Sequence, residues 1–480
     1  MAYQLRKAPR APVASVALAP APTAERARPA GPLVLPALLG ATIIGTLSNN
    51  ILNVPLRNVT DSFHASVSAG VLVVSSFVLV LAAGMALTGW VGDRFGRNRT
   101  LTAALILMVA AQVGAALAPS LGVLVATRAV QGLACSAIPP QVMGMLADIF
   151  PARQRARMMG AWAAANGAGQ AVGPPLGGLL TGLWGWRSIF WLLAPLTVLV
   201  IGFTRSLPRS DSPRPAPLHW QGAALLTIGA TLVMTAATAI PQRAVPGWVD
   251  GALGLAGAGC IAGFVVTSRR TAHPLVPLPL LTEIRFVRSA IATLTQMFAL
   301  MTFLVAVPLY ITGTLGRSAG ITGLLFFVLP AAMAVLAPVV GALSDRVGPR
   351  LVLRCGLVVL IASCLAMGIF TEQQARSLPL LCVLLFALGT GVALVQTPAA
   401  TGATRSPAGR QGSALGLFNM MRFGGSAFGA AWVAVLYPRG AMLLLFGGSA
   451  LLLVLALVVS VLGPDPEPVL APHPGETVSA

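Results

Sequence analysis

The chain is a succession of apolar runs, each about 20 residues long, separated by short polar or charged segments. Wound as an α-helix, a run of this length crosses the roughly 30 Å hydrocarbon layer of a membrane. Two of the runs are less apolar than the others, because glycine and alanine dilute them, and they lie near 220–240 and 248–267. The pattern predicts fourteen helical spans, near 33–54, 69–91, 100–119, 121–148, 157–182, 188–207, 220–240, 248–267, 286–312, 321–343, 351–371, 377–402, 411–436 and 440–463.

Composition favours the same class of protein. Of the 480 residues, 56% are hydrophobic and only 9% are charged, and the mean hydropathy is +0.85. A soluble domain carries about a quarter charged residues and could not bury so much apolar surface, so we expect the lipid bilayer to be the solvent for much of the chain. The five cysteines all lie in apolar runs without the spacing of a disulfide framework or a metal site, which indicates small packing residues.

The formal net charge of +19 does not indicate a nucleic-acid partner, because the basic residues follow the predicted spans. One side of the membrane receives 23 of them and the other side 6, while Arg128 and Arg422 fall inside spans. This alternation holds when both of the less apolar runs are counted as spans, or when neither is. The positive-inside rule then places both termini in the cytoplasm.

The polar stretches divide the chain into a predicted series of parts. Residues 8–32 are rich in Ala, Pro and Arg and lack the apolar core and cleavage site of a signal peptide, so we expect the first span to remain as an uncleaved anchor. The predicted parts are a disordered cytoplasmic tail at 1–32, a six-helix bundle at 33–207, a cytoplasmic linker at 208–219, two additional spans and a loop at 220–285, a second six-helix bundle at 286–463 and a cytoplasmic tail at 464–480.

The motif Gly-x-x-x-Asp-Arg-x-Gly occurs twice, beginning at Gly89 and at Gly341, each time between two predicted spans. Glycine permits a tight reversal and close packing, and an aspartate is favoured beside a helix N-terminus, where it can also pair with an arginine. A single copy is compatible with an ordinary solvated turn, whereas two copies in matching positions indicate an internal repeat of six-helix halves. The candidate residues are Gly89, Asp93, Arg94, Gly96 and Arg97 in the first copy and Asp345, Arg346, Gly348 and Arg350 in the second.

Further motifs lie between residues 40 and 200, and together they resemble a known family. Arg128-x-x-Gln131-Gly132 lies in the fourth run, Gly169-x-x-x-Gly173-Pro174-x-x-Gly177-Gly178 in the fifth, and Leu47 to Leu56 in the first. With the two loop motifs, they are similar to those of the major facilitator superfamily, and more closely to its 14-span drug:proton antiporter branch. The resemblance implies an all-α membrane protein of two six-helix bundles with two extra central helices, which exports drugs or secondary metabolites in exchange for protons.

The fifth run and Arg128 have physical interpretations of their own. Glycines at i, i+4 and i+8 leave a groove for a neighbouring helix, and Pro174 removes a helical hydrogen bond and permits bending. Ordinary small-residue packing is the alternative, while the resemblance implies a helix that favours exchange over leak. Arg128 lies at membrane depth, where a charge is costly. It either pairs with backbone carbonyls for structure or, as the resemblance implies, takes part in proton transfer or substrate binding.

The acidic residues depart from the antiporter pattern. Ser48 stands where the first-span motif of the family carries an acid, and none of the twelve Asp and Glu residues falls in the middle of a span. The four histidines also lie in loops, near span ends or in the tail. Proton-coupled export of cations generally needs a buried carboxylate that can lose and regain a proton. Asp148, at the end of the fourth run, is the nearest candidate, and a loop interaction with Arg153 or Arg157 is its alternative role.

The interior of the spans offers guanidinium and amide groups instead. Two buried guanidiniums without buried acids favour an anion or a carbonyl-rich solute over a cation. We therefore expect a cavity near the membrane midplane for a neutral or anionic amphipathic solute. Interhelical hydrogen bonding is the competing role for most of the amides. The candidate residues for this path are Asn49, Asn53, Arg128, Gln131, Asp148, Asn419 and Arg422.

The expected mechanism is alternating access, in which Asp93 with Arg97 and Asp345 with Arg350 latch the cytoplasmic ends of the two bundles. No phosphate-binding loop and no cluster of catalytic or metal-binding residues is recognisable, so neither an ATPase, nor another enzyme, nor a cofactor is expected. A channel is the alternative class, but it would need a continuous polar stripe. Arginine outnumbers lysine by 30 to 1, which is typical of a GC-rich bacterial genome and indicates the bacterial plasma membrane.

Overall fold

The computed structural model describes residues 31–208, 217–239, 247–317 and 319–463, and all regular structure in these ranges is helical. The predicted tails at 1–32 and 464–480 lie almost wholly outside them, as do residues 209–216 of the predicted linker. The helices up to residue 204 are α1 (Val34–Asn50), α2 (Leu56–Ser62), α3 (Val67–Phe95), α4 (Arg97–Ala116), α5 (Leu121–Ser136), α6 (Ile138–Ile149), the 3₁₀ turn η1 (Ala152–Gln154), α7 (Arg155–Trp184) and α8 (Arg187–Thr204).

The remaining helices follow the predicted order of the second part of the chain. They are α9 (Trp220–Ala239), α10 (Gly247–Arg270), α11 (Leu278–Leu281), α12 (Ile284–Gly313), α13 (Ala319–Val347), α14 (Pro349–Glu372), α15 (Leu378–Arg405), η3 (Pro407–Arg410), α16 (Gly412–Leu436), η4 (Tyr437–Arg439) and α17 (Met442–Val461).

Each of the fourteen predicted apolar runs coincides with helix in the described residues, the fourth with the consecutive helices α5 and α6. Within the part of the chain that the structure describes, eleven spans, with α5 and α6 taken together as one, are long and apolar enough to cross a membrane. Helix α1 is apolar but shorter, at 17 residues. The α5–α6 break falls at Ala137, just before Pro139 and Pro140, because proline is favoured in the first turn of a helix but not in its interior.

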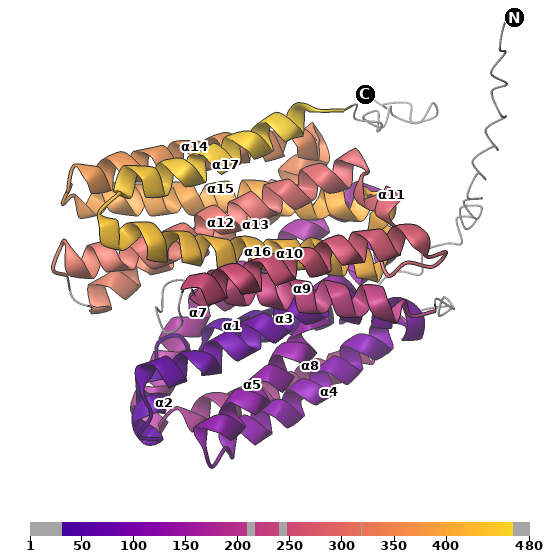
Figure 1. Ribbon diagram of the computed structural model, residues 1–480, viewed down its shortest axis with the longest axis horizontal. Helices are drawn as coiled ribbons and strands as arrows, with labels where there is room; N and C mark the ends of the chain where they lie inside the picture. The colour runs from indigo at the N-terminus through magenta and orange to yellow at the C-terminus, as the bar shows by residue number, and fades with distance from the viewer. Residues whose placement is uncertain (1–30, 209–216, 240–246, 318, 464–480) are drawn as a thin grey trace, which may run out of the picture. The chain divides into compact units, whose positions relative to one another are not determined.

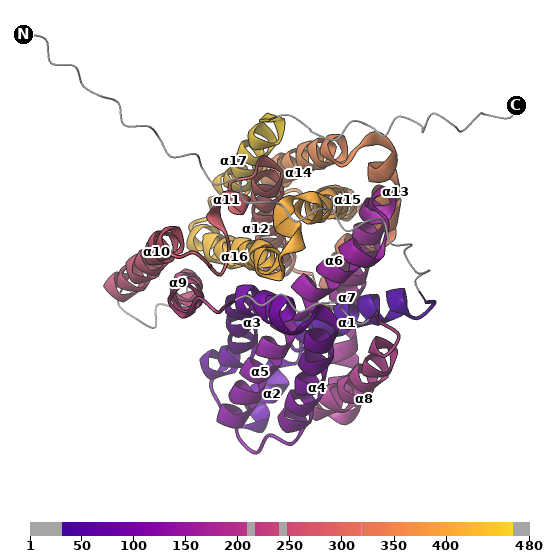
Figure 2. The ribbon, with the colours of Figure 1, turned by 90° about the vertical axis from the view of Figure 1, so that its right-hand side faces the viewer.

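Apart from α9, α10 and α11, the helices of the described residues form two bundles of roughly parallel helices (Figure 1). The first contains α1 to α8 and the second α12 to α17, and Figure 2 shows them side by side when viewed along the helices. Between the bundles, α3 packs against α16 and α7 packs against α13. The candidate site lies along these two helix–helix contacts.

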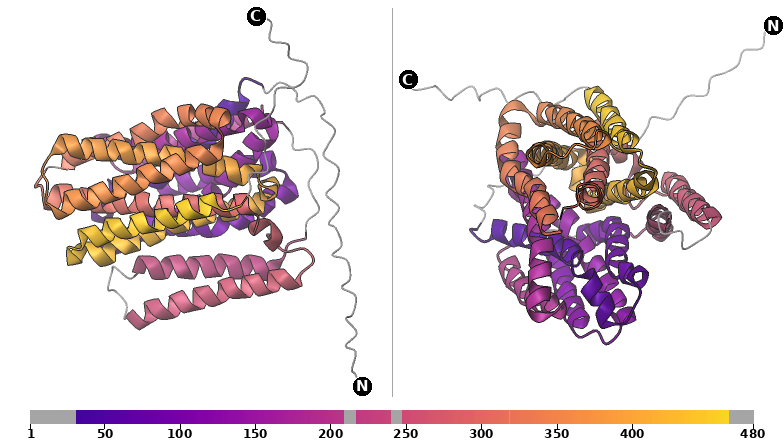
Figure 3. Two further views of the ribbon diagram at one scale, coloured as in Figure 1. Left: turned by 90° about the horizontal axis from the view of Figure 1, so that it is seen from above. Right: turned by 90° about the vertical axis from the view of Figure 1, so that its left-hand side faces the viewer.

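Helices α9 and α10, which are central in the chain, lie at the edge of the paired bundles (Figures 2 and 3). Helix α9 packs against α3 and α16, and α10 packs chiefly against α9. The outer surface of this pair is apolar, with Trp220, Trp248 and Leu255 at least 75% exposed. An apolar face of this kind is suited to lipid.

The two loop motifs adopt one backbone conformation. Gly96 (φ 95°, ψ 134°) ends α3 and precedes α4, and Gly348 (φ 93°, ψ 137°) does the same between α13 and α14. Positive φ is readily accessible only to glycine, which explains a glycine at both positions. The internal repeat predicted from the sequence therefore has a matching geometry in both halves.

Candidate functional site

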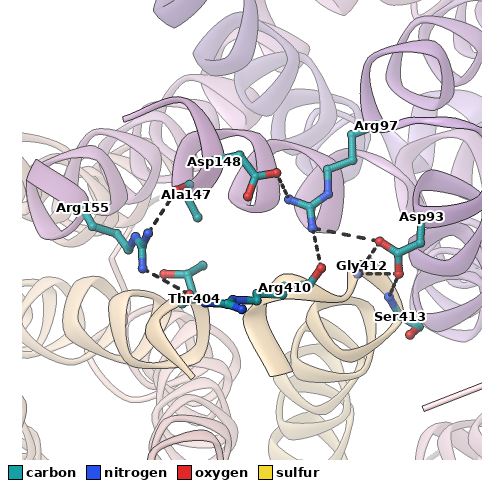
Figure 4. Close-up of polar contacts among 9 residues, drawn as sticks. All are labelled: Asp93, Arg97, Ala147, Asp148, Arg155, Thr404, Arg410, Gly412 and Ser413. Atoms are coloured by element: carbon teal, nitrogen blue, oxygen red, sulfur yellow. Dashed lines mark hydrogen bonds and ion pairs between the residues drawn. The ribbon is translucent and has the colours of Figure 1, made fainter. Parts of the chain in front are cut away.

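The end of α3 contacts the first turn of α16 across the two bundles. The carboxylate of Asp93 accepts hydrogen bonds from the backbone N–H of Gly412, at 2.7 and 2.8 Å, and of Ser413, at 3.3 Å (Figure 4). The first N–H groups of a helix have no partner within it and form the positive end of its dipole. Because Gln411, the N-cap residue of α16, provides no side-chain cap, Asp93 caps α16 from the opposite half.

Gly89 allows the two backbones to come this close. A Cβ atom on Gly89 would lie 2.0 Å from the carbonyl oxygen of Gly412, and one on Gly412 would lie 2.4 Å from the carbonyl oxygen of Gly89. One turn farther along α16, a Cβ on Gly416 would lie 2.1 Å from the carbonyl oxygen of Met85. The first glycine of the loop motif is therefore a point of contact between helices of the two halves.

The second loop motif makes the same contact in the opposite direction. The carboxylate of Asp345, near the end of α13, accepts hydrogen bonds from the backbone N–H of Ala156 at 3.2 Å and of Arg157 at 2.9 Å, in the first turn of α7. A Cβ atom on Gly341 would lie 2.7 Å from the carbonyl oxygen of Ala156. Each half of the molecule thus caps a helix of the other half with the aspartate of its loop motif.

Arg97 connects the Asp93 contact to two further groups. Its guanidinium donates to the carboxylate of Asp148 at 2.8 Å and to the backbone carbonyl of Arg410, in the other half, at 3.2 Å (Figure 4). The predicted pair with Asp93 is present at 4.0 Å. Arg97 is 7% exposed, whereas the side chain of Asp148 is 63% exposed. Asp148 therefore lies at the surface of this contact, with Arg97 as its ion-pair partner in place of Arg153 or Arg157.

Two arginines that the sequence did not single out also cross between the halves. Arg155 donates to the carbonyl of Ala147 at 3.1 Å and to that of Thr404 at 3.5 Å (Figure 4). Arg405 donates to the carbonyl of Ala152 at 3.3 Å and lies 3.6 Å from Asp345. A second short repeat in the sequence could have indicated this region. The dipeptide Pro-Ala precedes α7 at 151–152 and α16 at 407–408.

The structure does not bring Asp345 and Arg350 together as expected. The guanidinium of Arg350 donates to backbone carbonyls at the end of α17, including those of Ser460 and Val461, because its position in the first turn of α14 points it at that helix. The other two motif arginines make no bond between the halves in the described structure. Arg94 lies over the ring of Phe95, at 5.9 Å, and Arg346 is exposed.

A cavity of about 90 Å³, lined by both apolar and polar side chains, lies between the two bundles. Helices α1, α3, α5, α6 and α7 line one side, and α12 and α16 line the other. Arg422 of α16 is 3% exposed, and its guanidinium lies 5.2 Å from the ring of Trp162 on α7 and 5.6 Å from that of Phe423. No carboxylate is among the described lining residues, whose polar members include Thr42, Thr46, Asn49, Asn50, Asn166, Gln170 and Ser426.

The other predicted path residues lie outside the cavity lining. Asn419 is buried and donates to the sulfur of Met143, in the opposite half, at 3.3 Å, and to the carbonyl of Leu415. Asn53 is exposed beyond the end of α1. Of the predicted set, the structure places Asn49 and Arg422 together at the cavity.

Arg128 is fully buried within the first bundle, among oxygen acceptors. It donates to the carbonyls of Val73 at 3.2 Å and Ser48 at 3.0 Å and to the side-chain oxygen of Gln131, at 2.6 Å. Its guanidinium also lies 4.2 Å from the centre of the Phe77 ring. Ser48 is in the last turn of α1, where carbonyls lack helical partners, so Arg128 stabilises the end of this helix.

The glycines of the fifth run face α1, as a groove would require. Cβ atoms on Gly169 and Gly177 would lie 2.7 Å from the Cβ of Thr46 and 2.0 Å from the carbonyl oxygen of Ile51. Those on Gly173 and Gly178 would meet Asn50 at 3.2 Å and Val54 at 3.3 Å, while Pro174 lies within the helix. On other turns of α7, Cβ atoms on Gly160 and Gly167 would meet α13, at 2.5 Å from Ala337 and 2.9 Å from Ala334. Helix α7 therefore packs closely against a helix of each bundle.

Comparison with known proteins identifies the class of protein in which these two inverted contacts between the bundles occur. The family model described as Major Facilitator Superfamily matches residues 38–280 and 289–479, and the chain belongs to this superfamily of membrane transporters.

Its relatives include the multidrug resistance protein Stp of Mycobacterium tuberculosis, with 32% identity over 81% of this chain and 74% of Stp. The drug efflux pump JefA of the same organism is 30% identical over 81% of this chain and 76% of JefA. Among solved structures, the human organic anion transporter MFSD10 superposes with a TM-score of 0.65, covering 89% of this chain and 99% of that one, at 18% identity, a likeness of fold alone.

Proposed function

We propose that this protein exports small amphipathic solutes, such as drugs or secondary metabolites, by alternating access across fourteen spans, with proton antiport as the energy source. The observation that carries the proposal is the pair of contacts through which Asp93 and Asp345 each cap a helix of the opposite bundle. Such contacts form only while the bundles are together at this end, and they break when the bundles rotate apart. The multidrug resistance and drug efflux names of the two relatives support export.

The predicted topology assigns these contacts to the cytoplasmic face. In this assignment the described conformation has its cytoplasmic end closed. Binding sites for drug-sized ligands usually have volumes of about 300 to 1,000 Å³. Because the cavity has about 90 Å³, a substrate of that size can enter only when the bundles move apart. The close contacts therefore act as a gate between solute binding and release.

The chemistry of the cavity favours a neutral or anionic solute. Arg422 supplies a guanidinium against the face of Trp162, and the remaining polar groups are amides and hydroxyls. A guanidinium at this depth attracts an oxyanion or a carbonyl oxygen and repels a quaternary cation. Asn49 has a buried side-chain oxygen without a hydrogen-bond partner in the described structure, which leaves an acceptor for a solute N–H or O–H group.

Proton coupling rests on the antiporter resemblance more than on a buried carboxylate. Asp148, the nearest acid, is mostly exposed and pairs with Arg97 at the gate. The alternative is a major-facilitator carrier that is anion-selective or not coupled to protons, with a channel as the remaining alternative. Among these alternatives, the absence of carboxylates from the described cavity lining favours the anion-selective carrier.

Transport into inverted membrane vesicles, with and without an imposed pH gradient, separates these possibilities. Antiport predicts uptake that requires the gradient and collapses when an uncoupler dissipates it. A coupling-free carrier would equilibrate the solute at the same rate in both conditions, and a channel would show no saturation with solute concentration.

A panel of fluorescent solutes of similar size, one anionic, one neutral and one quaternary cationic, tests the cavity chemistry. We expect saturable transport of the first two and its loss in Arg422→Ala. Arg439→Ala, at an exposed position away from the cavity, is the matched control. Saturable export of the quaternary cation, undiminished in Arg422→Ala, would overturn the assignment.

A further inference from the structure

The cavity between the bundles has walls of unlike chemistry. On the side of the second bundle, α12 contributes a stripe of four apolar residues at helical spacing, which are Met297, Leu300, Met301 and Leu304. On the side of the first bundle, α1 and α7 contribute hydroxyl and amide groups, from Thr42, Thr46, Asn49, Asn50, Asn166 and Gln170. A solute in this cavity therefore meets apolar groups along one edge and hydrogen-bonding groups along another.

The apolar wall results from the direction in which the side chains of α12 point. This helix also has polar residues at the same depth, since Gln296 and Thr302 are both 0% exposed, but neither is among the described residues that line the cavity. Thr302 accepts a hydrogen bond from the hydroxyl of Ser449 on α17, at 3.3 Å, and so points into the second bundle. The wall that remains includes Met297 and Met301, whose flexible thioethers adapt to varied apolar shapes.

The wall from α1 presents hydrogen-bond acceptors. The side-chain nitrogen of Asn50 donates to the backbone carbonyl of Thr46 at 2.9 Å. Because a carbonyl only accepts hydrogen bonds, the side-chain oxygen of Asn50 is turned away from it. The side-chain oxygen of Asn49 is buried and has no hydrogen-bond partner in the described structure. A buried acceptor without a donor is costly, so this wall favours a solute that carries an O–H or N–H group.

The guanidinium group and these acceptors lie toward opposite ends of the cavity. Arg422 is beside Trp162, near the start of α7, which is the end that the gate contacts hold. Gln170 is eight residues farther along α7, a rise of about 12 Å. Asn50 belongs to this farther end, because a Cβ atom on Gly173 of α7 would lie 3.2 Å from its Cβ. The cavity therefore has a cationic end on the gate side and an acceptor end away from it.

We propose that the cavity selects an elongated solute with an oxyanion or carbonyl oxygen at one end, an O–H or N–H donor toward the other, and an apolar edge. This inference rests on the proposed function and deepens it by naming the class of solute and its orientation. The oxygen lies against Arg422, the donor against Asn49, and the apolar edge along α12. Recognition is strict for the donor, which needs a partner at one position, and broad for the apolar edge, where methionine side chains rearrange.

Two rod-shaped solutes of equal charge and similar size separate recognition of the donor from general affinity. One is a biphenyl carboxylate with a hydroxyl group in the para position of the far ring, and the other has a methyl group there. Isothermal titration of the full-length protein in nanodiscs measures the Kd of each. The variants are Asn49→Leu on the polar wall, Met301→Gln on the apolar wall and, as a control at an exposed position outside the cavity, Gln373→Leu.

We expect the wild type to bind the hydroxyl compound about tenfold more tightly than the methyl compound, the effect of one hydrogen bond. Asn49→Leu should remove this preference, Met301→Gln should weaken the binding of both solutes and keep it, and Gln373→Leu should change neither Kd. Equal affinities in the wild type, or an undiminished preference in Asn49→Leu, would overturn the proposal. Should Asn49→Leu not fold, Asn49→Ala removes the same oxygen without added bulk and gives the same comparison.

Transport of both solutes into inverted vesicles, measured in parallel, separates this proposal from the proposed export. The expected preference in binding, without transport of either solute, would contradict export and support the assignment of the walls. Saturable transport without any preference between the two solutes would overturn that assignment and leave export standing.

Discussion

The two contacts that we propose as the gate share a backbone arrangement and differ in where their arginine comes from. At the first, Arg97 follows Asp93 by four residues, within the loop motif itself. At the second, Pro349 stands in the position equivalent to Arg97, and the guanidinium near Asp345 belongs to Arg405, at the end of α15. Both arginines donate to a backbone carbonyl of the opposite half. The element that the halves share is therefore the aspartate that caps a helix, while the guanidinium can be delivered from either of two helices.

The glycine on which the first contact depends gives the largest expected effect. Gly89→Ala places a Cβ atom 2.0 Å from the carbonyl oxygen of Gly412, and backbone atoms at this separation must move apart. We expect transport to fall to near background while the protein still inserts and folds. The control is Gly182→Ala, at a position where a Cβ atom meets nothing within 4 Å. Equal transport by the two variants would show that close backbone approach at α16 is not needed.

The two aspartates sharpen the comparison. Asp93→Asn and Asp345→Asn remove the negative charge from a helix N-terminus at nearly constant shape, a loss of about 0.5 to 2 kcal/mol for a cap. Asp93 makes the shorter bonds, at 2.7 and 2.8 Å against 2.9 and 3.2 Å for Asp345, so we expect its variant to lose more transport activity. Initial rates in vesicles, normalised to protein amount, measure the difference. A larger loss of transport in Asp345→Asn than in Asp93→Asn would contradict this order of the two contacts.

Asp148 provides a smaller effect that separates a gate role from a proton role. Its side chain is 63% exposed, and exposed ion pairs contribute about 0 to 1 kcal/mol. As a gate residue, Asp148→Asn should lower the transport rate by a few-fold at most and leave the dependence on the pH gradient unchanged. Complete loss of gradient-driven transport, with passive exchange of solute retained, would identify Asp148 as the proton-carrying group instead.

Arg350 should have the smallest effect on gating. It holds the end of α17 and makes no contact with the first bundle in the described structure, so Arg350→Gln should lower thermal stability by about 1 kcal/mol and leave the separation between bundles unchanged. Thermal unfolding in detergent measures the first quantity. If Arg350→Gln changed the separation between the bundles as much as Asp345→Asn does, Arg350 would be the partner of Asp345 that the sequence led us to expect.

The loop motifs predicted the repeat, the turn glycines and the participation of Asp93 and Asp345, because those features depend on local residue order. They did not predict the partners. Asp93 binds backbone N–H groups that lie 319 and 320 residues away, and a backbone donor has no signature in the sequence. Closeness in the sequence favoured Arg350 as the partner of Asp345. In the structure, the direction of α14 turns Arg350 toward α17, and Arg405 of α15 lies beside Asp345 instead.

The interior was predictable in part for a similar reason. Arg422 and Asn49 were expected at the cavity from their depth in the spans, and both line it. Arg128 satisfies the same criterion of depth, but its direction from α5 places it among the carbonyls of α1 and α3. Depth in a span follows from sequence, whereas the direction in which a side chain points requires the packed helices.

The most direct test of the gate is the separation of the bundles at their predicted cytoplasmic ends. Spin labels at Phe95 and Arg410 report the Asp93 contact, and labels at Arg153 and Arg346 report the Asp345 contact, in a background whose five cysteines are replaced. All four positions are exposed. Pulsed electron–electron double resonance should give a short distance between the two labels of each pair in the wild type. Asp93→Asn should lengthen both distances together, since the bundles rotate as rigid bodies. Unchanged distances in Asp93→Asn and Asp345→Asn alike would contradict the assignment of these contacts as the gate.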